Sequence, residues 1–144
     1  MYKNILVGFD GSAGSKEALD HAIRLAKQLG SRLTALWVKG SLPHFPETID
    51  EVQTEESAAA SFFKKLSKEI HNLSVQYSIE LKIEHLSGHA AKTIIDYAKK
   101  INADLIVLGS VGHHSGILSG FLGHTADRVS ENSPCSVLII RSAK

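Results

Sequence analysis

The stretch LGSVGHHSGILSGFLGHT, residues 108–125, follows the apolar run Leu105–Leu108 and precedes a short helical pattern that ends near Pro134. Five of the fifteen residues from 109 to 123 are glycine. Because glycine costs backbone entropy on folding, this density indicates a backbone that turns tightly or approaches a ligand closely. A strand end, a glycine loop and a helix amino-terminus together present unpaired N–H groups and a positive dipole end. The stretch therefore predicts a phosphate site.

The composition is that of an ordinary globular domain. The chain has 144 residues, 43% of them hydrophobic, and a formal net charge of +1, whereas a nucleic-acid-binding protein more often carries a basic stripe. No apolar run approaches the ~18 residues that span a bilayer, and the amino-terminus shows no signal-type segment. The single cysteine, Cys135, excludes an intrachain disulfide and fits a reducing compartment. We therefore expect one cytoplasmic domain over residues 1–144, with neither nucleic acid nor membrane as a partner.

Short apolar runs alternate with helical patterns along the whole chain. Strands are expected at 5–9, 33–38, 79–84, 103–108 and 135–140, and helices carry apolar stripes over 18–29, 59–73, 91–101 and about 124–132. Ser12 and Ser15 are both candidate caps of the first helix, and Gly30 is its stop. This alternation predicts a five-stranded, parallel, doubly wound α/β sheet of order 3-2-1-4-5, with helices on both faces.

The connections between these elements show turn residues. Residues 39–48 contain Gly40, Pro43 and Pro46 and are expected to form a loop, and Ser87–His89 a turn. The strand at 79–84 alternates apolar and charged residues, so it has one wet face and is expected at a sheet edge. Trp37, Phe62 and Phe63 are expected in the core, and Cys135 in packing.

Distinctive residues follow three of the expected strands. Asp10 comes after the first strand, Val38 after the second and Gly109 after the fourth. In open α/β sheets ligands bind beyond the carboxyl ends of the strands, where the strand order reverses. An aspartate there suits a ribose hydroxyl or a metal; the alternative is that it only caps the first helix. Neither GxxxxGK[ST] nor a GxGxxG after the first strand is present, which excludes two standard phosphate motifs.

Three segments resemble the universal stress protein family. Residues 3–12 look like the family's opening strand and acidic turn, residues 103–110 like its fourth strand, and residues 133–141 like its closing strand. The segments occur in the family's order, and the resemblance covers essentially the whole chain. It implies the Rossmann-like fold of that family.

The glycine loop resembles that of the family's nucleotide-binding branch, with two departures. That loop reads glycine, two residues, glycine, nine residues, glycine, then serine or threonine. Here ten residues separate Gly112 from Gly123, and His124 stands at the hydroxyl position, with Thr125 one place later. The missing hydroxyl removes one hydrogen bond, although an imidazole could donate in its place.

The resemblance implies a site for an adenine nucleotide (ATP, ADP or AMP). In it Asp10 and the backbone near Gly8 and Phe9 meet the ribose and base, and Val38 lies beside the adenine. The phosphates are surrounded by Gly109, Gly112, Gly123, His124 and Thr125, and Leu108 is a further nucleotide-binding residue. Asp10 or the phosphates could hold Mg²⁺, and no resident metal site is expected. His113 and His114 invite a metal interpretation, but neighbouring loop residues without further ligands favour a solvated loop.

The sequence therefore predicts an adenine-nucleotide-binding stress-response regulatory protein. The loop has no Lys or Arg, so efficient catalysis is not expected. The alternatives are a nucleotide-free dimerisation or interaction module and a slow ATPase. Val137–Ile140 is apolar on both faces although it should lie at a sheet edge, and exposed apolar edges are usually covered. The family's pairing of this strand across a two-fold axis implies a homodimer, and a further protein partner stays open.

Overall fold

The computed structural model describes residues 1–40, 49–110 and 123–141, and for 49–56 the backbone alone. Five strands and four helices alternate along the described chain. In order they are β1 (Asn4–Gly8), α1 (Ala13–Leu29), β2 (Arg32–Gly40), α2 (Ile49–Tyr77), β3 (Leu81–Gly88), α3 (Ala90–Lys100), β4 (Leu105–Gly109), α4 (His124–Asn132) and β5 (Ser136–Ile140). No helix in these ranges is both long and apolar enough to cross a bilayer.

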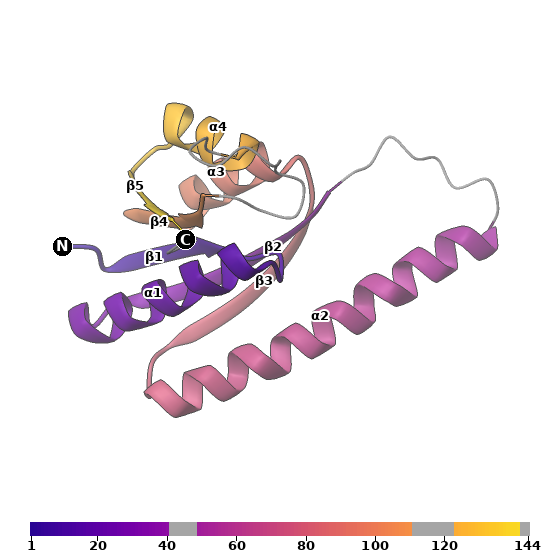
Figure 1. Cartoon of the computed structure of the whole chain (residues 1–144), viewed down its shortest axis with the longest axis horizontal. Coiled ribbons are helices and arrows are strands. Elements are labelled where there is room, and N and C mark those ends of the chain that lie inside the picture. The colour runs from indigo at the N-terminus through magenta and orange to yellow at the C-terminus, as the bar shows by residue number, and fades with distance from the viewer. Residues whose placement is uncertain (41–48, 111–122, 142–144) are drawn as a thin grey trace.

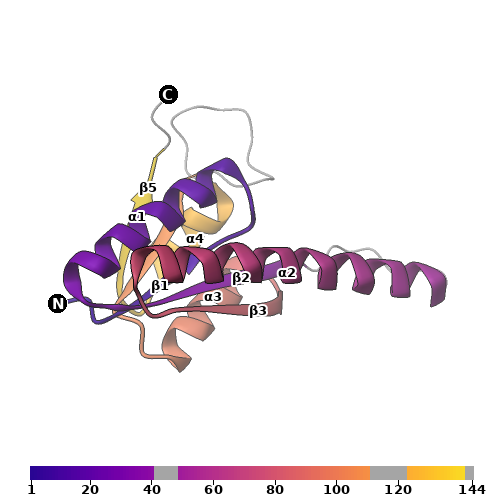
Figure 2. The same ribbon diagram turned by 90° about the horizontal axis from the view of Figure 1, so that it is seen from below.

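All the strands belong to one parallel sheet of order β3-β2-β1-β4-β5. The helices α1 and α2 cover one face of the sheet, and α3 and α4 cover the other (Figure 1). Figure 2 shows α2 running alongside the sheet, with its first turns extending past the strands. The predicted fold class and strand order are confirmed, and the third strand lies at an edge as expected.

Each face of the sheet carries its own hydrophobic core, because successive side chains of a strand point to opposite sides. Ile5 and Val7 pack with α1 and α2, whereas Leu6 packs with α3 and α4. Trp37 and Phe62 are half-buried against the first core, as predicted. Cys135 packs against the second core, and burial raises the pKa of its thiol, which fits the predicted packing role.

The expected ends of two strands are wrong. β2 continues through Lys39 to Gly40, and β3 continues through Ser87 to Gly88, so the predicted loop does not begin at Lys39 and the predicted turn does not begin at Ser87. The register pairs Gly40 with Gly88, so these residues extend the β2–β3 ladder. Lysine, serine and glycine are typical of loops, and the sequence carries no sign of the partner strand. The rest of the predicted loop, 41–48, lies outside the described residues.

The two ends of α1 follow from local hydrogen bonds. Ser12, rather than Ser15, is the amino-terminal cap: its Oγ accepts a hydrogen bond from the N–H of Ser15 at 3.3 Å. At the other end Gly30 has a φ of 69°, and its N–H donates to the carbonyl of Ala26. A left-handed residue that closes such a bond ends a helix, which confirms Gly30 as the stop.

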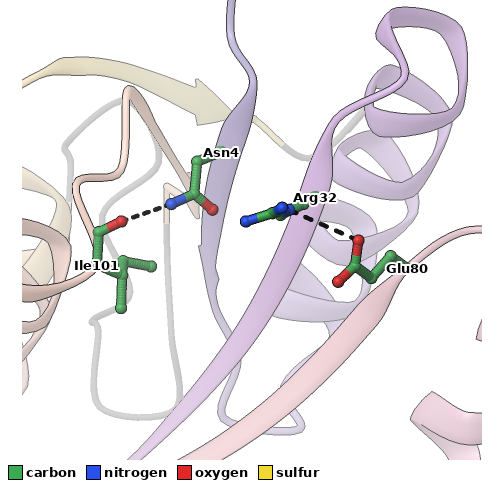
Figure 3. A network of polar contacts seen from close by, with 4 residues as sticks. All are labelled: Asn4, Arg32, Glu80 and Ile101. Carbon is green, nitrogen blue, oxygen red and sulfur yellow. Dashed lines mark hydrogen bonds and ion pairs between the residues drawn. The ribbon is translucent and has the colours of Figure 1, made fainter.

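Polar contacts join the strands at the amino-terminal edge of the sheet (Figure 3). The Asn4 side chain donates from Nδ2 to the carbonyl of Ile101 at 2.6 Å. The Asp104 carboxylate accepts from the backbone N–H groups of Lys3, at 2.7 Å, and Asn4, at 3.0 Å. Arg32 and Glu80 form an exposed ion pair at 3.7 Å. The contacts of Asn4 and Asp104 tie the start of β1 to that of β4, which aligns the opposite ends of these two strands.

Candidate functional site

The strands β2, β1 and β4 are the three inner strands of the sheet. Because the sheet is parallel, their carboxyl ends lie next to one another. β1 ends at Gly8 and is followed by Phe9 and Asp10, and β4 ends with Leu108 and Gly109. The parallel registers bring these two ends side by side. Nine of the ten predicted site residues are described, and the exception, Gly112, lies outside the described residues. Val38 lies within β2, two residues before its end, rather than after the strand.

Asp10 shapes the turn between β1 and α1. Its Oδ1 accepts a hydrogen bond from the N–H of Ser12 at 2.9 Å, and its own N–H donates to the Oγ of Ser15 at 3.3 Å. Gly11, between them, has a φ of 84°, which favours glycine. The carboxylate is half-buried at the strand end. Asp10 therefore has a structural role in the turn that leads to α1, in addition to the ligand contact predicted for it.

A side chain at Gly8 or Gly109 would collide with atoms of a neighbouring element. A Cβ on Gly8 would lie 2.6 Å from Cδ2 of Leu108. A Cβ on Gly109 would lie 2.8 Å from the backbone carbon and oxygen of Gly14, at the start of α1. Packing between neighbouring elements thus accounts for both glycines before any ligand is considered.

A pair of backbone hydrogen bonds fixes the start of α4 at the end of β4. The N–H of Gly123 donates to the carbonyl of Ser110 at 2.6 Å, and the N–H of Ser110 donates to the carbonyl of Ile140 at 2.9 Å. The first intrahelical bond of α4 runs from the N–H of Asp127 to the carbonyl of Gly123. Gly123 is the amino-terminal cap, and no side chain caps the helix. The N–H groups of the first turn and the positive end of the dipole therefore lie at this strand end.

The side chains that follow Gly123 differ in exposure. His124 is exposed, Thr125 is half-buried and Ala126 is buried. Val38 is half-buried against the core of the α3 and α4 face, the face on which α4 itself lies. Phe9 instead packs into the opposite core, and its N–H donates to the carbonyl of Leu36 at 2.9 Å. The ring of Phe9 therefore lies on the face that α1 and α2 cover, opposite to the face of Val38.

Ser110 is the anchor that sequence reasoning did not assign. It is 4% exposed and bonds through its backbone both to β5 and to the start of α4. A small polar residue directly after a buried apolar strand was the available signal. In the described ranges there is no group of three or more His, Cys, Asp or Glu side chains that could hold a metal ion. The pair His113 and His114 lies outside them.

Comparison with known proteins identifies the family. The model of the Universal stress protein family matches residues 1–141. The chain belongs to this family. A universal stress protein of Methanocaldococcus jannaschii is 34% identical, and the match covers 100% of this chain and 85% of that protein. The structure of universal stress protein UspA from Lactobacillus plantarum has a TM-score of 0.84 and 32% identity, with 97% of this chain and 98% of that chain covered. The predicted family is therefore confirmed.

Two more distant structures of the same fold were solved as nucleotide complexes. One is a universal stress protein in complex with cAMP, with a TM-score of 0.72, 23% identity and coverage of 96% of this chain and 97% of that chain. The other is the universal stress protein from Archaeoglobus fulgidus in complex with dAMP, with a TM-score of 0.65, 22% identity and coverage of 96% and 98%. Some proteins with this fold therefore bind adenine nucleotides.

Proposed function

We propose that this chain binds an adenine nucleotide at the carboxyl edge of the sheet and acts as a regulatory stress-response protein. The observation that carries the proposal is the hydrogen bond from Gly123 to Ser110, which holds the amino-terminus of α4 against the end of β4. Helix amino-termini bind phosphate because their N–H groups and dipole favour an anion. The cAMP and dAMP complexes of structural neighbours support the same ligand class.

The proposed contacts divide the nucleotide among three strand ends. The phosphates lie at the first turn of α4, against the backbone N–H groups of His124 and Thr125, and beside Gly123, whose own N–H donates to Ser110. The ribose lies near Asp10, and the adenine packs against Val38, which is half-buried on the face that α4 covers. Gly8, Leu108 and Gly109 form the floor between the two central strands. The bound nucleotide would bias the protein's conformation or its partner binding by contacting two states differently.

Mg²⁺ fits this site as a companion of the phosphates. Mg²⁺ is commonly held by one or two carboxylates together with substrate phosphates, and Asp10 supplies a carboxylate at this edge. Efficient hydrolysis is not part of the proposal, because residues 109–125 contain neither Lys nor Arg to stabilise the transition state. A slow ATPase and a nucleotide-free interaction module are the alternatives.

Calorimetric titration with ATP, ADP and AMP tests the proposal, with a Gly123→Val variant. Gly123 has a φ of −64° and a ψ of 160°, which valine adopts readily, so the substitution adds bulk without backbone strain. We expect binding by the wild type and a loss of at least about tenfold in the variant. The control is Gln76→Val, because Gln76 is exposed near the end of α2, at the opposite end of the strands. This variant should bind nucleotide as the wild type does. Absence of heat and of any thermal shift at millimolar nucleotide would favour the nucleotide-free module.

We also propose a homodimer through β5. β5 pairs with β4 along one side and with no other described strand, so one of its edges is open. Leu138 is 37% exposed on it, between the half-buried Val137 and Ile139. An open apolar edge is a template for pairing with another chain, and a second copy of β5 would cover it.

A further inference from the structure

Four aromatic rings meet where α2 crosses β2 and β3. Trp37 from β2 stacks on His85 from β3, with ring centroids 4.4 Å apart and 18° between the planes. Phe63 from α2 lies 5.3 Å from His85, and Phe62 lies 4.6 Å from Trp37. Trp37 and His85 are register partners in the parallel ladder. This group, the His85 cluster, joins the helix to both strands.

His85 is the polar member of the cluster, and one of its nitrogens has no hydrogen-bond partner in the described part of the chain. Its Nε2 atom is buried, and none of the described residues hydrogen-bonds to it. A neutral imidazole can leave this nitrogen as an unused acceptor. A protonated ring would instead place an N–H donor and a positive charge there, without an acceptor, and both are costly to bury. Burial therefore lowers the pKa of His85, and the charge of Lys39 lowers it further.

Among the described residues, the charged groups around the cluster do not offset this cost. On β2 the nearby charge is Lys39, and on α2 the residues after Phe63 are the exposed Lys64 and Lys65. On β3 the neighbouring Glu84 accepts a hydrogen bond from the hydroxyl of Tyr97 on α3, which covers the opposite face. The aromatic face of Trp37 attracts a cation and so favours the protonated form of His85. The side chains of Glu51, Glu55 and Glu56 lie outside the described residues.

We propose that the His85 cluster is a proton-sensitive attachment: neutral His85 holds α2 on β2 and β3, and protonation of His85 loosens the helix. Because the pKa of His85 is lowered in the folded protein, the stabilising contribution is present above the ordinary histidine pKa. It is lost as the pH falls through the lowered value. The proposal does not rest on nucleotide binding, since it is argued from the contacts of α2 with β2 and β3 alone.

Tryptophan fluorescence measures the protonation of His85. Trp37 is the single tryptophan of the chain, and a protonated imidazole stacked on an indole quenches its emission. A titration from about pH 8 to about pH 5 should show quenching with a midpoint below the ordinary value of 6.5. His85→Phe keeps a ring in the stack and should abolish the transition. His71→Gln, an exposed histidine of α2, should leave it unchanged.

Hydrogen exchange measures the loosening of α2. After correction for intrinsic rates, the amides of 57–77 in α2 should exchange several-fold faster at the acidic end than at neutral pH, whereas those of α1 should not. His85→Phe should remove the difference, and Lys39→Met should move the midpoint upward. Glu55→Gln with Glu56→Gln should leave the midpoint in place. A transition that persists in His85→Phe, a midpoint above 6.5, or α2 exchange that ignores the titration would each overturn the proposal.

Discussion

The N–H of Gly123 lies 2.6 Å from the carbonyl oxygen of Ser110, so the two ends of the glycine loop are hydrogen-bonded to each other. Whatever path the twelve residues between them follow, the start of α4 stays at the end of β4. The one-residue difference from the spacing in the resembled family loop lies between these two hydrogen-bonded residues. His124 is the remaining departure, because it replaces a hydroxyl side chain directly after the anchored residue.

His124 is expected to weaken nucleotide binding relative to a hydroxyl side chain at the same position. It is exposed in the first turn of α4, where the family loop that this chain resembles carries a serine or threonine. A hydroxyl there can donate a hydrogen bond to a phosphate oxygen. His124→Ser should therefore raise ATP affinity about fivefold, or about 1 kcal/mol. Calorimetry of both proteins at one pH measures the change.

An alanine at position 124 provides the control for that prediction. His124→Ala removes the imidazole but supplies no hydroxyl, so it separates the loss of the ring from the gain of a hydrogen bond. It should bind ATP more weakly than His124→Ser. Equal affinity in the two variants would exclude the side chain at position 124 from the phosphate site.

Alanine substitutions at Gly8 and Gly109 should lower the free energy of unfolding by different amounts, because the added Cβ meets a side chain at one position and backbone at the other. The Cβ at 109 would meet backbone of Gly14 at 2.8 Å, which cannot move without shifting α1, whereas the Cβ at 8 would meet the end of the Leu108 side chain at 2.6 Å. We expect Gly109→Ala to lower the free energy of unfolding by about 3 kcal/mol, and Gly8→Ala by about 1 kcal/mol. Urea denaturation measures both, and a reversed order would contradict the proposed α1–β4 packing.

The fold was predictable from the sequence because the information is periodic. Buried parallel strands are continuous apolar runs, as at Leu105–Leu108, and the helices between them have one apolar stripe. The ends of β2 and β3 were not predictable, because Lys39 and Gly88 are in strand conformation through the pairing of β2 with β3. A single segment carries no record of such pairing.

The position of the candidate site was predictable, but the packing contacts that require glycine at two of its residues were not. Topology placed the carboxyl ends of β1 and β4 together, and the family resemblance named the residues there. The reasons for Gly8 and Gly109 lie in neighbours distant in sequence, Leu108 and Gly14. The His85 cluster escaped notice for the same reason, since Trp37, Phe63 and His85 belong to three separate elements.

Two polar contacts at the amino-terminal edge should differ in their contribution to stability. Asp104→Ala leaves the N–H groups of Lys3 and Asn4 without their acceptor, so we expect a loss of about 1 to 2 kcal/mol. Arg32→Ala removes an ion pair whose side chains are each 76% exposed, which should cost under about 0.5 kcal/mol. Chemical denaturation of both variants checks this contrast. Similar losses would mean that Asp104 does not align β1 with β4.

The open edge of β5 should govern the oligomeric state. In a dimer that pairs two copies of β5, Leu138 would be buried, and a glutamate there would place like charges opposite each other across the two-fold axis. Light scattering after size exclusion should give twice the chain mass for the wild type and the single chain mass for Leu138→Glu at micromolar concentration. Val75→Glu changes a 66% exposed apolar residue on α2 and should stay dimeric. If both variants dissociate, or neither does, the β5 interface is wrong, because the two positions lie on different elements and share only their apolar exposure.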